Sequence, residues 1–566
     1  MFRAGNCFRI FSAATVLLVV SVLACHGAHG QASLQTSLQP PPQVSLQSSR
    51  QDSPGSAAQS DNALGEALAG LEGDPLTLSD AVAAALVEAT DVGIASANLA
   101  AARANVRKQK GTFDPEIFAE ALHTSISQAS ASFFAGADVL ETEQTVAEAG
   151  ARMKLPLGTE LAASLNTIKF ATNSDFTSLS PQYNSVGKLE ITQPLLRGLG
   201  PSTKGQLTAA ERVLEAEEAR YQDAVYSVRA DVEATYWELY ANERDLAVQR
   251  LIRDRAIAFL KDTELRSSAG LAGPNEVANA RVFLAEQEQV VLDREDALDL
   301  VSDRLATLMG RRPSGDQWRF RAVDQPPTDF PLAPVETLVQ LALERNYDLR
   351  AGERQVDALR ALAKKASWDA LPTLDLFGML GGYGLAGKGR DVIFQFDPEA
   401  DPDTLKNNLD TGVGESISQV VNRDFPTWEV GVVFRYPLGN RANGGEKDRL
   451  RAQVRRAEQD LIAGQRALEE QIRAQYRELS RGRRRLEVAS EGVDASSEQV
   501  RIGTIEYEHG RTTAFELVRL GADLAAAQQR YSAALVRAAR AAAELRRLTA
   551  GGYPEVVTSG GSSAEQ

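Results

Sequence analysis

Cysteine and histidine are scarce in this chain of 566 residues. The two cysteines, Cys7 and Cys25, lie in the first 30 residues, so the rest of the chain can form no internal disulfide. Beyond that region the histidines are His123 and His509, too few for a Cys/His zinc site. Glycine motifs for phosphate or dinucleotide binding are also missing. We therefore expect no catalytic site, no metal and no cofactor.

Long hydrophobic runs and an excess of positive charge are missing as well. After the N-terminus no segment reaches about 18 consecutive apolar residues, so no transmembrane helix is expected there. The chain has 61 Lys and Arg against 76 Asp and Glu, a net charge of −15. Proteins that bind nucleic acid need a basic face for the phosphates, so nucleic acid is not an expected partner.

The first 30 residues have the features of an export signal. Arg3 and Arg9 precede an apolar run, residues 10–24, that is too short for a membrane span. Two processing sites stay open: cleavage before Gln31, or lipidation of Cys25 behind a loose lipobox. Residues 31–74, rich in Gln, Ser and Pro, are expected to form a disordered leader, and residues 552–566 a flexible tail.

The longest predicted element is a helix over residues 202–266, which contain no proline. Its apolar residues recur every seven positions, a pattern that keeps one seam facing a partner helix and is typical of coiled coils. The row consists of Val225, Val232, Leu239 and Leu246, with Leu260 in the same phase. At 1.5 Å per residue the helix would be roughly 98 Å long, far longer than helices of ordinary globular domains.

The second half of the chain repeats the plan of the first. A shift of 240 residues aligns the long helices, and a shift of 257 aligns the segments before the strands. Matching pairs under the first shift include Tyr236/Tyr476, Leu239/Leu479, Gly270/Gly510, Glu276/Glu516 and Leu305/Leu545. We predict two repeats, residues 75–310 and 332–551, joined by a linker at 311–331. In the first, medium helices over 78–110 and 275–309 would flank a β section and the long helix.

The β sections begin where Pro115 and Pro372 end a helix. The clearest strand is 427–436, which has a polar face and a nearly apolar one. The apolar face consists of Trp428, Val430, Val432, Phe434 and Tyr436. The pattern matches a membrane-spanning barrel strand or a half-buried strand of a soluble protein.

Three further strands occupy matching positions in the repeats: residues 185–193 and strands that begin at Glu116 and Thr373. Four strands leave two bare edges, so several chains would have to pool strands to close a barrel. An extra alternating pattern on both sides of 156–159 predicts a second hairpin between loops at 128–144 and 171–183, either in the wall or outside it. The run Gly381–Gly384 is predicted to open a loop.

Within this duplicated plan, three short motifs resemble those of the TolC-type outer membrane efflux proteins. They are QPLLRG at 193–198, ATYW at 234–237 and YEHGRTT at 507–513. The resemblance covers residues 78–551. It implies a mainly α fold with β: a homotrimer whose chains form a twelve-stranded outer membrane β-barrel, continuous with a long coiled-coil tunnel in the periplasm.

The function implied by this resemblance is that of a passive exit duct for efflux or secretion. Such a duct lies in outer membrane lipid, and its helical part meets a periplasmic membrane fusion adaptor and an inner-membrane pump. The alternative is a periplasmic coiled-coil scaffold that spans the envelope without a pore. A scaffold has no need for the outward apolar row from Trp428 to Tyr436.

The turns between long and medium helices are the candidate adaptor contacts. Gly270 and Gly510 break the heptads and can adopt the left-handed conformation that ends a helix. The resemblance implies that these glycines, with the adjacent Leu271 and Arg511, form tips that contact the adaptor.

The periplasmic entrance is the second candidate site. Glu276 and Glu516 lie six residues after the two glycines, and the resemblance places Glu516 at the first of two acidic ring positions. The second acidic position is Arg519 in this chain. Since Arg519 lies on the same helical face as Glu516, we expect the two to pair, within one chain or between subunits.

Overall fold

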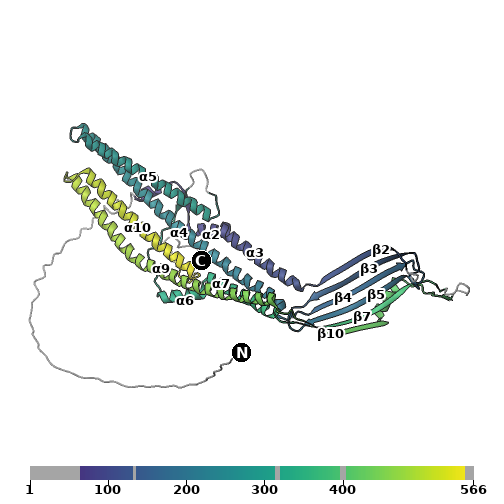
Figure 1. Cartoon of the computed structure of the whole chain (residues 1–566). Helices are drawn as coiled ribbons and strands as arrows, with labels where there is room; N and C mark the ends of the chain where they lie inside the picture. Colours follow the sequence, from purple (N-terminus) through teal and green to yellow (C-terminus); the bar gives the residue numbers. More distant parts are fainter. Residues whose placement is uncertain (1–63, 132–134, 313–318, 395–402, 555–566) are drawn as a thin grey trace, which may run out of the picture. The chain divides into compact units, whose positions relative to one another are not determined.

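The computed structural model describes residues 64–131, 135–312, 319–394 and 403–554. The predicted signal peptide, Cys25, and most of the predicted leader and tail lie outside these residues. Long helices and one large sheet make up the described part (Figure 1). None of the helices in these ranges combines the length and hydropathy that a membrane crossing needs.

The long helices belong to two hairpins of equal size. Helices α4 (Pro201–Ser268) and α9 (Arg441–Glu508) have 68 residues each, and α5 (Pro274–Leu308) and α10 (Ala514–Leu548) have 35 each. Each helix of the second hairpin begins 240 residues after its counterpart in the first. These matched lengths support the predicted duplication.

The medium helix predicted over 78–110 is broken, so that prediction was wrong in one respect. The break at Ala89, where ψ is 133°, separates α2 (Leu78–Glu88) from α3 (Thr90–Lys110), which a short 3₁₀ turn, η1 (Gly111–Phe113), follows. In the second half Asn346 separates α6 (Val335–Arg345) from α7 (Tyr347–Asp369). Asn346 accepts a bond from the Leu349 N–H (3.0 Å) and donates one to the Leu548 carbonyl (3.1 Å). Its polar side chain thus replaces helical hydrogen bonds at the break.

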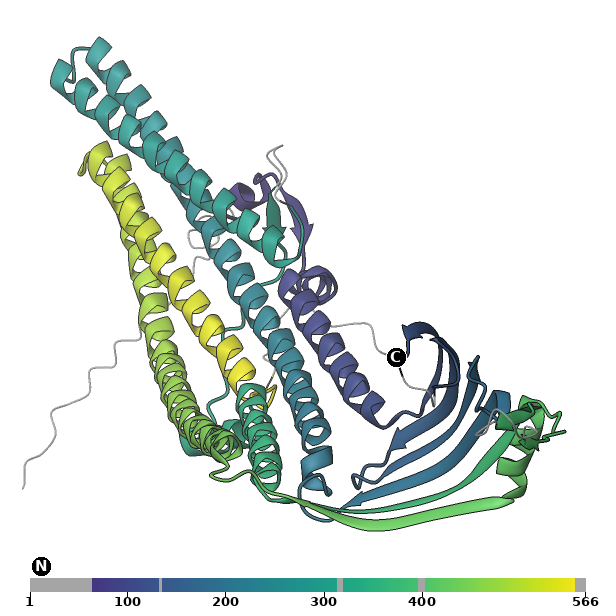
Figure 2. The same ribbon diagram turned by 45° about the vertical axis from the view of Figure 1, so that its right-hand side comes forward.

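The medium helices pack along the long ones. Helices α3 and α5 contact α4, while α7 and α10 contact both α9 and α4 (Figure 2). The predicted heptad rows face these contacts. Their buried members include Val232, Leu239, Leu246, Leu298, Leu305, Ile472, Leu479 and Leu486. Burial of this seam stabilises helices that would be marginal alone.

The predicted boundaries of leader, linker and tail need correction. Strand β1 (Asp74–Leu76) pairs in parallel with β6 (Phe320–Ala322), so ordered structure precedes residue 75 and the linker at 311–331 contains a strand. Leu71 is buried against the helices. At the other end Tyr553 is buried and donates a hydrogen bond to the Pro331 carbonyl (2.8 Å). Apolar side chains thus extend the packed core past both predicted limits.

The large sheet has six antiparallel strands in the order β10-β7-β5-β4-β3-β2 (Figure 2). They are β2 (Glu116–Ala129), β3 (Val139–Lys154), β4 (Glu160–Thr172), β5 (Leu179–Pro194), β7 (Thr373–Gly389) and β10 (Phe425–Arg435). β2 and β7 begin at the predicted residues. The extra hairpin β3–β4 pairs with a strand on each side, so it belongs to the sheet. The sheet therefore has six strands, two more than the four at matching positions of the repeats.

The connections at the two ends of the sheet differ in length. Residues 155–159 form the tight turn between β3 and β4, in which Gly158 has φ +98° and the Leu155 N–H donates to the Thr159 carbonyl (2.7 Å). The connection between β7 and β10 is longer; it holds the short strands β8 (Val392–Phe394) and β9 (Asp403–Leu405) and a helix, α8 (Val413–Asn422). The loops predicted at 128–144 and 171–183 are shorter, because strand pairing extends into both.

The run Gly381–Gly384 lies inside β7 instead of opening a loop, so that prediction was wrong. Helix α8, which the sequence did not predict, packs on the sheet at this point. A Cβ at residue 384 would collide with the Ser416 carbonyl oxygen, and one at 382 would lie 3.2 Å from the Val420 carbonyl oxygen. The glycines are therefore required for close approach of α8 to the strand.

Candidate functional site

The part of the sheet nearest the long helices carries an apolar face. Residues paired across antiparallel strands point to the same side, and the registers place Ile117, Ala151, Ala163, Leu189, Leu380 and Trp428 in one row on that side. The predicted outward row of β10 lies on this face: Trp428, Val430, Val432 and Phe434 are 61–74% exposed. So large an exposed apolar surface marks contact with lipid or with another protein.

The opposite face of the same strands is charged. Four ion pairs lie on it, joining Glu116 to Arg152 (2.8 Å), Lys154 to Glu160 (2.9 Å), Lys188 to Glu190 (3.9 Å) and Asp375 to Arg435 (3.6 Å). Glu120, Glu148 and Glu429 share this side by the same registers. Charged on one side and apolar on the other, the sheet has the alternation of a barrel wall between lipid and water.

Among the residues that the structure describes, each edge strand of the sheet pairs with one other strand. β2 pairs with β3, and β10 pairs with β7. Since every unpaired edge presents free backbone donors and acceptors, such an edge cannot remain bare in lipid. The sheet is therefore a segment of a larger closed structure if it crosses a membrane.

The turns at the far ends of the two long helices have the predicted geometry. Gly270 and Gly510 are left-handed, with φ of +77° and +68°. The following N–H groups, of Leu271 and Arg511, each donate to the carbonyl five residues back at 2.8 Å. This is the Schellman end that the glycines predicted. Leu271 is 72% exposed and Arg511 is also exposed, so both residues are accessible at the tips.

Of the predicted entrance residues, Glu276 and Glu516 lie in the first turns of α5 and α10, and Arg519 lies one turn further along α10. Arg519 donates to Glu516 at 2.6 Å within the chain, as one of the two predicted pairings required. Thr513 caps α10 by accepting from the Glu516 N–H (3.2 Å). Glu276 is exposed in α5, and position 279, which corresponds to Arg519, is an asparagine. The two repeats thus present different charge at matching places.

Near the tips a contact between the hairpins was not predicted. The Tyr507 hydroxyl lies 3.2 Å from Asp262, joining α9 to α4, beside a cavity of about 380 Å³. Burial, and secondarily the Asp262 charge, raises the pKa of Tyr507. Phe259 and Phe515 also approach, with ring centroids 6.3 Å apart. No spacing in the sequence relates Asp262 to Tyr507, because the repeat shift pairs neither residue with the other.

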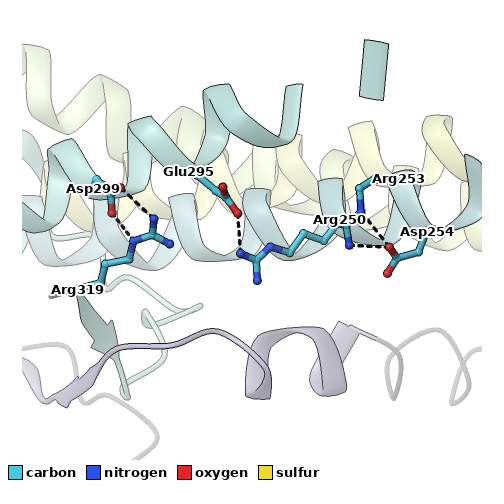
Figure 3. A network of polar contacts seen from close by, with 6 residues as sticks. All are labelled: Arg250, Arg253, Asp254, Glu295, Asp299 and Arg319. Atoms are coloured by element: carbon cyan, nitrogen blue, oxygen red, sulfur yellow. Dashed lines mark hydrogen bonds and ion pairs between the residues drawn. The ribbon is translucent and has the colours of Figure 1, made fainter. Parts of the chain in front are cut away.

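Polar contacts hold the first hairpin together (Figure 3). Arg250 on α4 donates to Glu295 on α5 at 2.6 Å, and beside it Arg253 pairs with Asp254. Arg319, just before β6, forms a two-bonded pair with Asp299. The Arg250–Glu295 pair holds α4 to α5, and the Arg319–Asp299 pair holds α5 to the linker just before β6.

Buried polar groups of α4 anchor the linker and β1. The Tyr236 hydroxyl accepts from the Val323 and Asp324 N–H groups (3.1 Å each) and lies 2.9 Å from the Leu76 carbonyl. Glu243 accepts from the Ala322 N–H (2.8 Å), and burial raises its pKa to about 8 despite that bond. These contacts join segments far apart in the chain, so no local pattern of residues predicts them.

Comparison of the sequence with known families matches residues 338–551 to the family "Outer membrane efflux protein". The fusaric acid resistance protein FusA of Burkholderia cepacia is 28% identical over 194 residues, 33% of this chain. That alignment spans about a third of the relative's length (35%).

The fold agrees with the family match. The outer membrane channel CmeC of Campylobacter jejuni has a TM-score of 0.59 at 15% identity, and 84% of this chain covers 86% of it. The chain resembles outer membrane efflux proteins in sequence and in fold. The resemblance to the efflux proteins predicted from the motifs is therefore confirmed, as is the mainly α fold with a β-barrel-type sheet.

Two further solved outer membrane proteins share this fold. The outer-membrane channel OprN has a TM-score of 0.58 at 20% identity, with 84% of this chain and 90% of that chain covered. The outer membrane protein VceC of Vibrio cholerae has a TM-score of 0.58 at 14% identity, with 84% and 97% covered. OprN and CmeC are described as outer membrane channels.

Proposed function

We propose that this chain is an outer membrane channel through which an efflux system exports small molecules, and that it has no enzymatic activity. The observation that carries the proposal is the sheet whose opposite faces are apolar and charged, joined directly to helices of 68 residues. Lipid suits the first face and a water-filled lumen suits the second. A periplasmic scaffold without a pore would leave the exposed row from Trp428 to Phe434 unexplained.

Membrane fractionation and planar bilayers test the channel directly. We expect the protein in the outer membrane fraction, and we expect the purified protein to conduct ions in a bilayer. Recovery in the soluble periplasmic fraction alone, with no conductance, would support the scaffold instead.

Closure of the sheet requires further chains, and we propose a homotrimer in outer membrane lipid with the helices in the periplasm. The bare edges of β2 and β10 support association through strands. In detergent the complex should have the mass of three chains. A folded monomer with all six strands would contradict this stoichiometry.

At the helix tips we propose docking of a periplasmic membrane fusion adaptor that connects the channel to an inner-membrane transporter. The exposed Leu271 and Arg511 beside left-handed Gly270 and Gly510 support the proposal. Replacing Leu271 with aspartate should abolish cross-linking to the adaptor and leave outer membrane insertion unchanged. Val87, 82% exposed on α2, is a control position for the same substitution.

Fusaric acid is the first substrate to test, because the relative FusA is described as a fusaric acid resistance protein. Deletion of the gene should lower the concentration of fusaric acid that stops growth, and the intact gene should restore it. Unchanged resistance would direct the search to other small molecules or to secreted protein.

Lipidation of Cys25 stays a proposal of its own. Mass spectrometry of the mature N-terminus should find either a diacylated Cys25 or an unmodified Gln31. The second result excludes lipidation.

A further inference from the structure

The two edges of the sheet are complementary to each other, and they allow the register between neighbouring copies to be derived. The argument rests on the proposed trimer. Six strands alternate in direction from β2 to β10, so β10 of one copy would run antiparallel to β2 of the next. Three copies then give eighteen strands with no break in the antiparallel pattern.

The stagger between copies follows from the registers within one copy. The row of paired residues that starts at Glu116 on β2 crosses the sheet through Arg152, Ala162, Glu190 and Met379, and ends at Glu429 on β10. β10 continues past Glu429 for six residues, to Arg435. In a closed ring of identical copies each copy lies at the same height. Glu116 is the residue of β2 nearest the helices, because α3 ends at Lys110, and Arg435 is the residue of β10 nearest the helices, because α9 begins at Arg441. The two residues therefore lie at the same end of the sheet.

We propose that β10 of one copy pairs with β2 of the next with Arg435 opposite Glu116, which closes an eighteen-stranded barrel. A stagger of six residues per copy adds up to a total stagger of eighteen residues around the ring of three copies. With a rise of about 3.3 Å per residue and about 4.8 Å between strands, the strands then tilt by about 35°. Barrels require a tilt of about 35–45°. With no stagger, Glu116 would face Glu429 and the strands would not tilt at all.

The side chains on both faces fit this register. On the charged side Arg435 meets Glu116, which extends two ion pairs already present, Asp375 with Arg435 and Glu116 with Arg152, into one row of alternating charge. On the apolar side Phe434 meets Ile117, both of which are exposed in the single chain. Going along the pair, Gly431 meets Glu120 and Glu429 meets Leu122, so no like charges face each other.

The extra strands also change the width of the pore. Barrel diameter grows roughly in proportion to strand number, so eighteen strands give a barrel about one and a half times as wide as twelve. Hairpin β3–β4 supplies this difference, since it is the part of the wall that lies outside the matched repeats.

Disulfide cross-linking tests the register. Glu116→Cys combined with Arg435→Cys should give dimer and trimer bands after oxidation of isolated outer membranes, and Ile117→Cys with Phe434→Cys should do the same from the apolar side. The two positions of each pair lie five strands apart in one sheet, about 24 Å, so no disulfide can form within a chain. Each single-cysteine variant is a control for cross-linking through other cysteines.

Two further pairs of cysteine substitutions distinguish the proposed register from other arrangements of the strands. Glu116→Cys with Glu429→Cys should not cross-link; if it does and the proposed pairs do not, the stagger is wrong. Glu116→Cys with Glu190→Cys, on β5, would form a disulfide within one chain only if hairpin β3–β4 left the sheet and β2 paired with β5 to give twelve strands, because two strands separate these positions in the six-stranded sheet; that disulfide would overturn the eighteen-stranded barrel but keep the trimer. A trimer without cross-links at the two proposed pairs also overturns it. A monomer absent from the outer membrane would instead refute the proposed function.

Discussion

The two long helices have the same length, heptad spacing and end geometry, but they occupy different environments. α4 packs along α2, α3, α5, α7 and α10, whereas α9 packs along α6, α7 and α10 and meets α4 near the tips, through Tyr507 and Asp262. Fully buried residues of α4 include Tyr236 and Trp237, while at the matching positions of α9 Tyr476 is half-buried and Arg477 is exposed. One plan thus yields a central helix in one half and a helix with a large free side in the other.

This difference indicates where each helix derives its stability. α4 is held by helices of its own chain on several sides, and aromatic rings fill the space between them: Trp237 contacts Tyr236 and Tyr240 edge-on, at 5.1 and 6.3 Å between centroids. The outer side of α9 carries arginines, among them Arg477, Arg481 and Arg484, which are exposed in the single chain. A polar side of this kind can contact water or a polar surface of another copy, whereas a side packed into a hydrophobic core would need apolar residues.

Replacing the central aromatic should have the largest effect. Trp237→Ala removes a fully buried side chain and should lower the free energy of unfolding by about 3–5 kcal/mol. The matched Arg477→Ala in α9 should change it by only about 0.5 kcal/mol. Thermal unfolding of the detergent-solubilised protein measures both. Equal losses would mean that α9 is as deeply packed as α4.

Replacing the matched tyrosines with phenylalanine should likewise lower the free energy of unfolding more in α4 than in α9. Tyr236→Phe leaves the Val323 and Asp324 N–H groups without their acceptor and should cost about 1–3 kcal/mol. In the described residues no hydrogen bond is seen for the Tyr476 hydroxyl, so Tyr476→Phe should cost about 0.5 kcal/mol or less. Urea unfolding of the two variants would show whether the linker anchor exists in one half alone.

The carboxyl group of Glu243 should make stability depend on pH. Its pKa is raised from 4.5 to about 8 because the side chain is buried. Between these values the folded chain holds a proton that the unfolded chain has released, so stability falls as pH rises from 4.5 through 8. Glu243→Gln keeps an acceptor for the Ala322 N–H and carries no charge. The variant should be more stable than the parent by about 1–3 kcal/mol at pH 8.5, with little difference at pH 4.5.

Unfolding at both pH values tests this, with Glu211→Gln as the control, since Glu211 is exposed on the same helix. A Glu243→Gln variant with the same advantage at pH 4.5 and 8.5 would show that its carboxyl titrates normally.

The smallest effect is expected at the tips, where the repeats differ by one charge. Exposed ion pairs contribute about 0–1 kcal/mol, so loss of the Arg519–Glu516 pair should hardly change stability. We expect Arg519→Ala to loosen the resting entrance and raise single-channel conductance, and Glu516→Gln to lower cation selectivity, since rings of carboxylates favour cations. Asn279→Ala is the matched control in the first repeat. Conductance and selectivity equal to those of the parent would make these residues ordinary surface charges.

Much of this architecture could be predicted from local sequence. Heptads gave the helix ends to within two residues, because a seven-residue apolar row is a strong and long signal. Prolines marked the start of strands at Glu116 and Thr373, and two glycines marked the left-handed turns at 270 and 510. Each of these features depends on residues close together in the chain.

The predictions that failed concern features that depend on partners far apart in the chain. Alanine favours helix, yet the chain is extended at Ala89, where it is buried in the core. The alternating pattern around residues 156–159 predicted a hairpin but could not assign its neighbours, since an alternating strand can pair on either side or on none. The contact of Tyr507 with Asp262 spans 245 residues. The helices, the turns and the starts of the strands follow from local sequence patterns. Which helix is central and how many strands form the large sheet are visible in the folded structure alone, because both depend on pairing between distant segments.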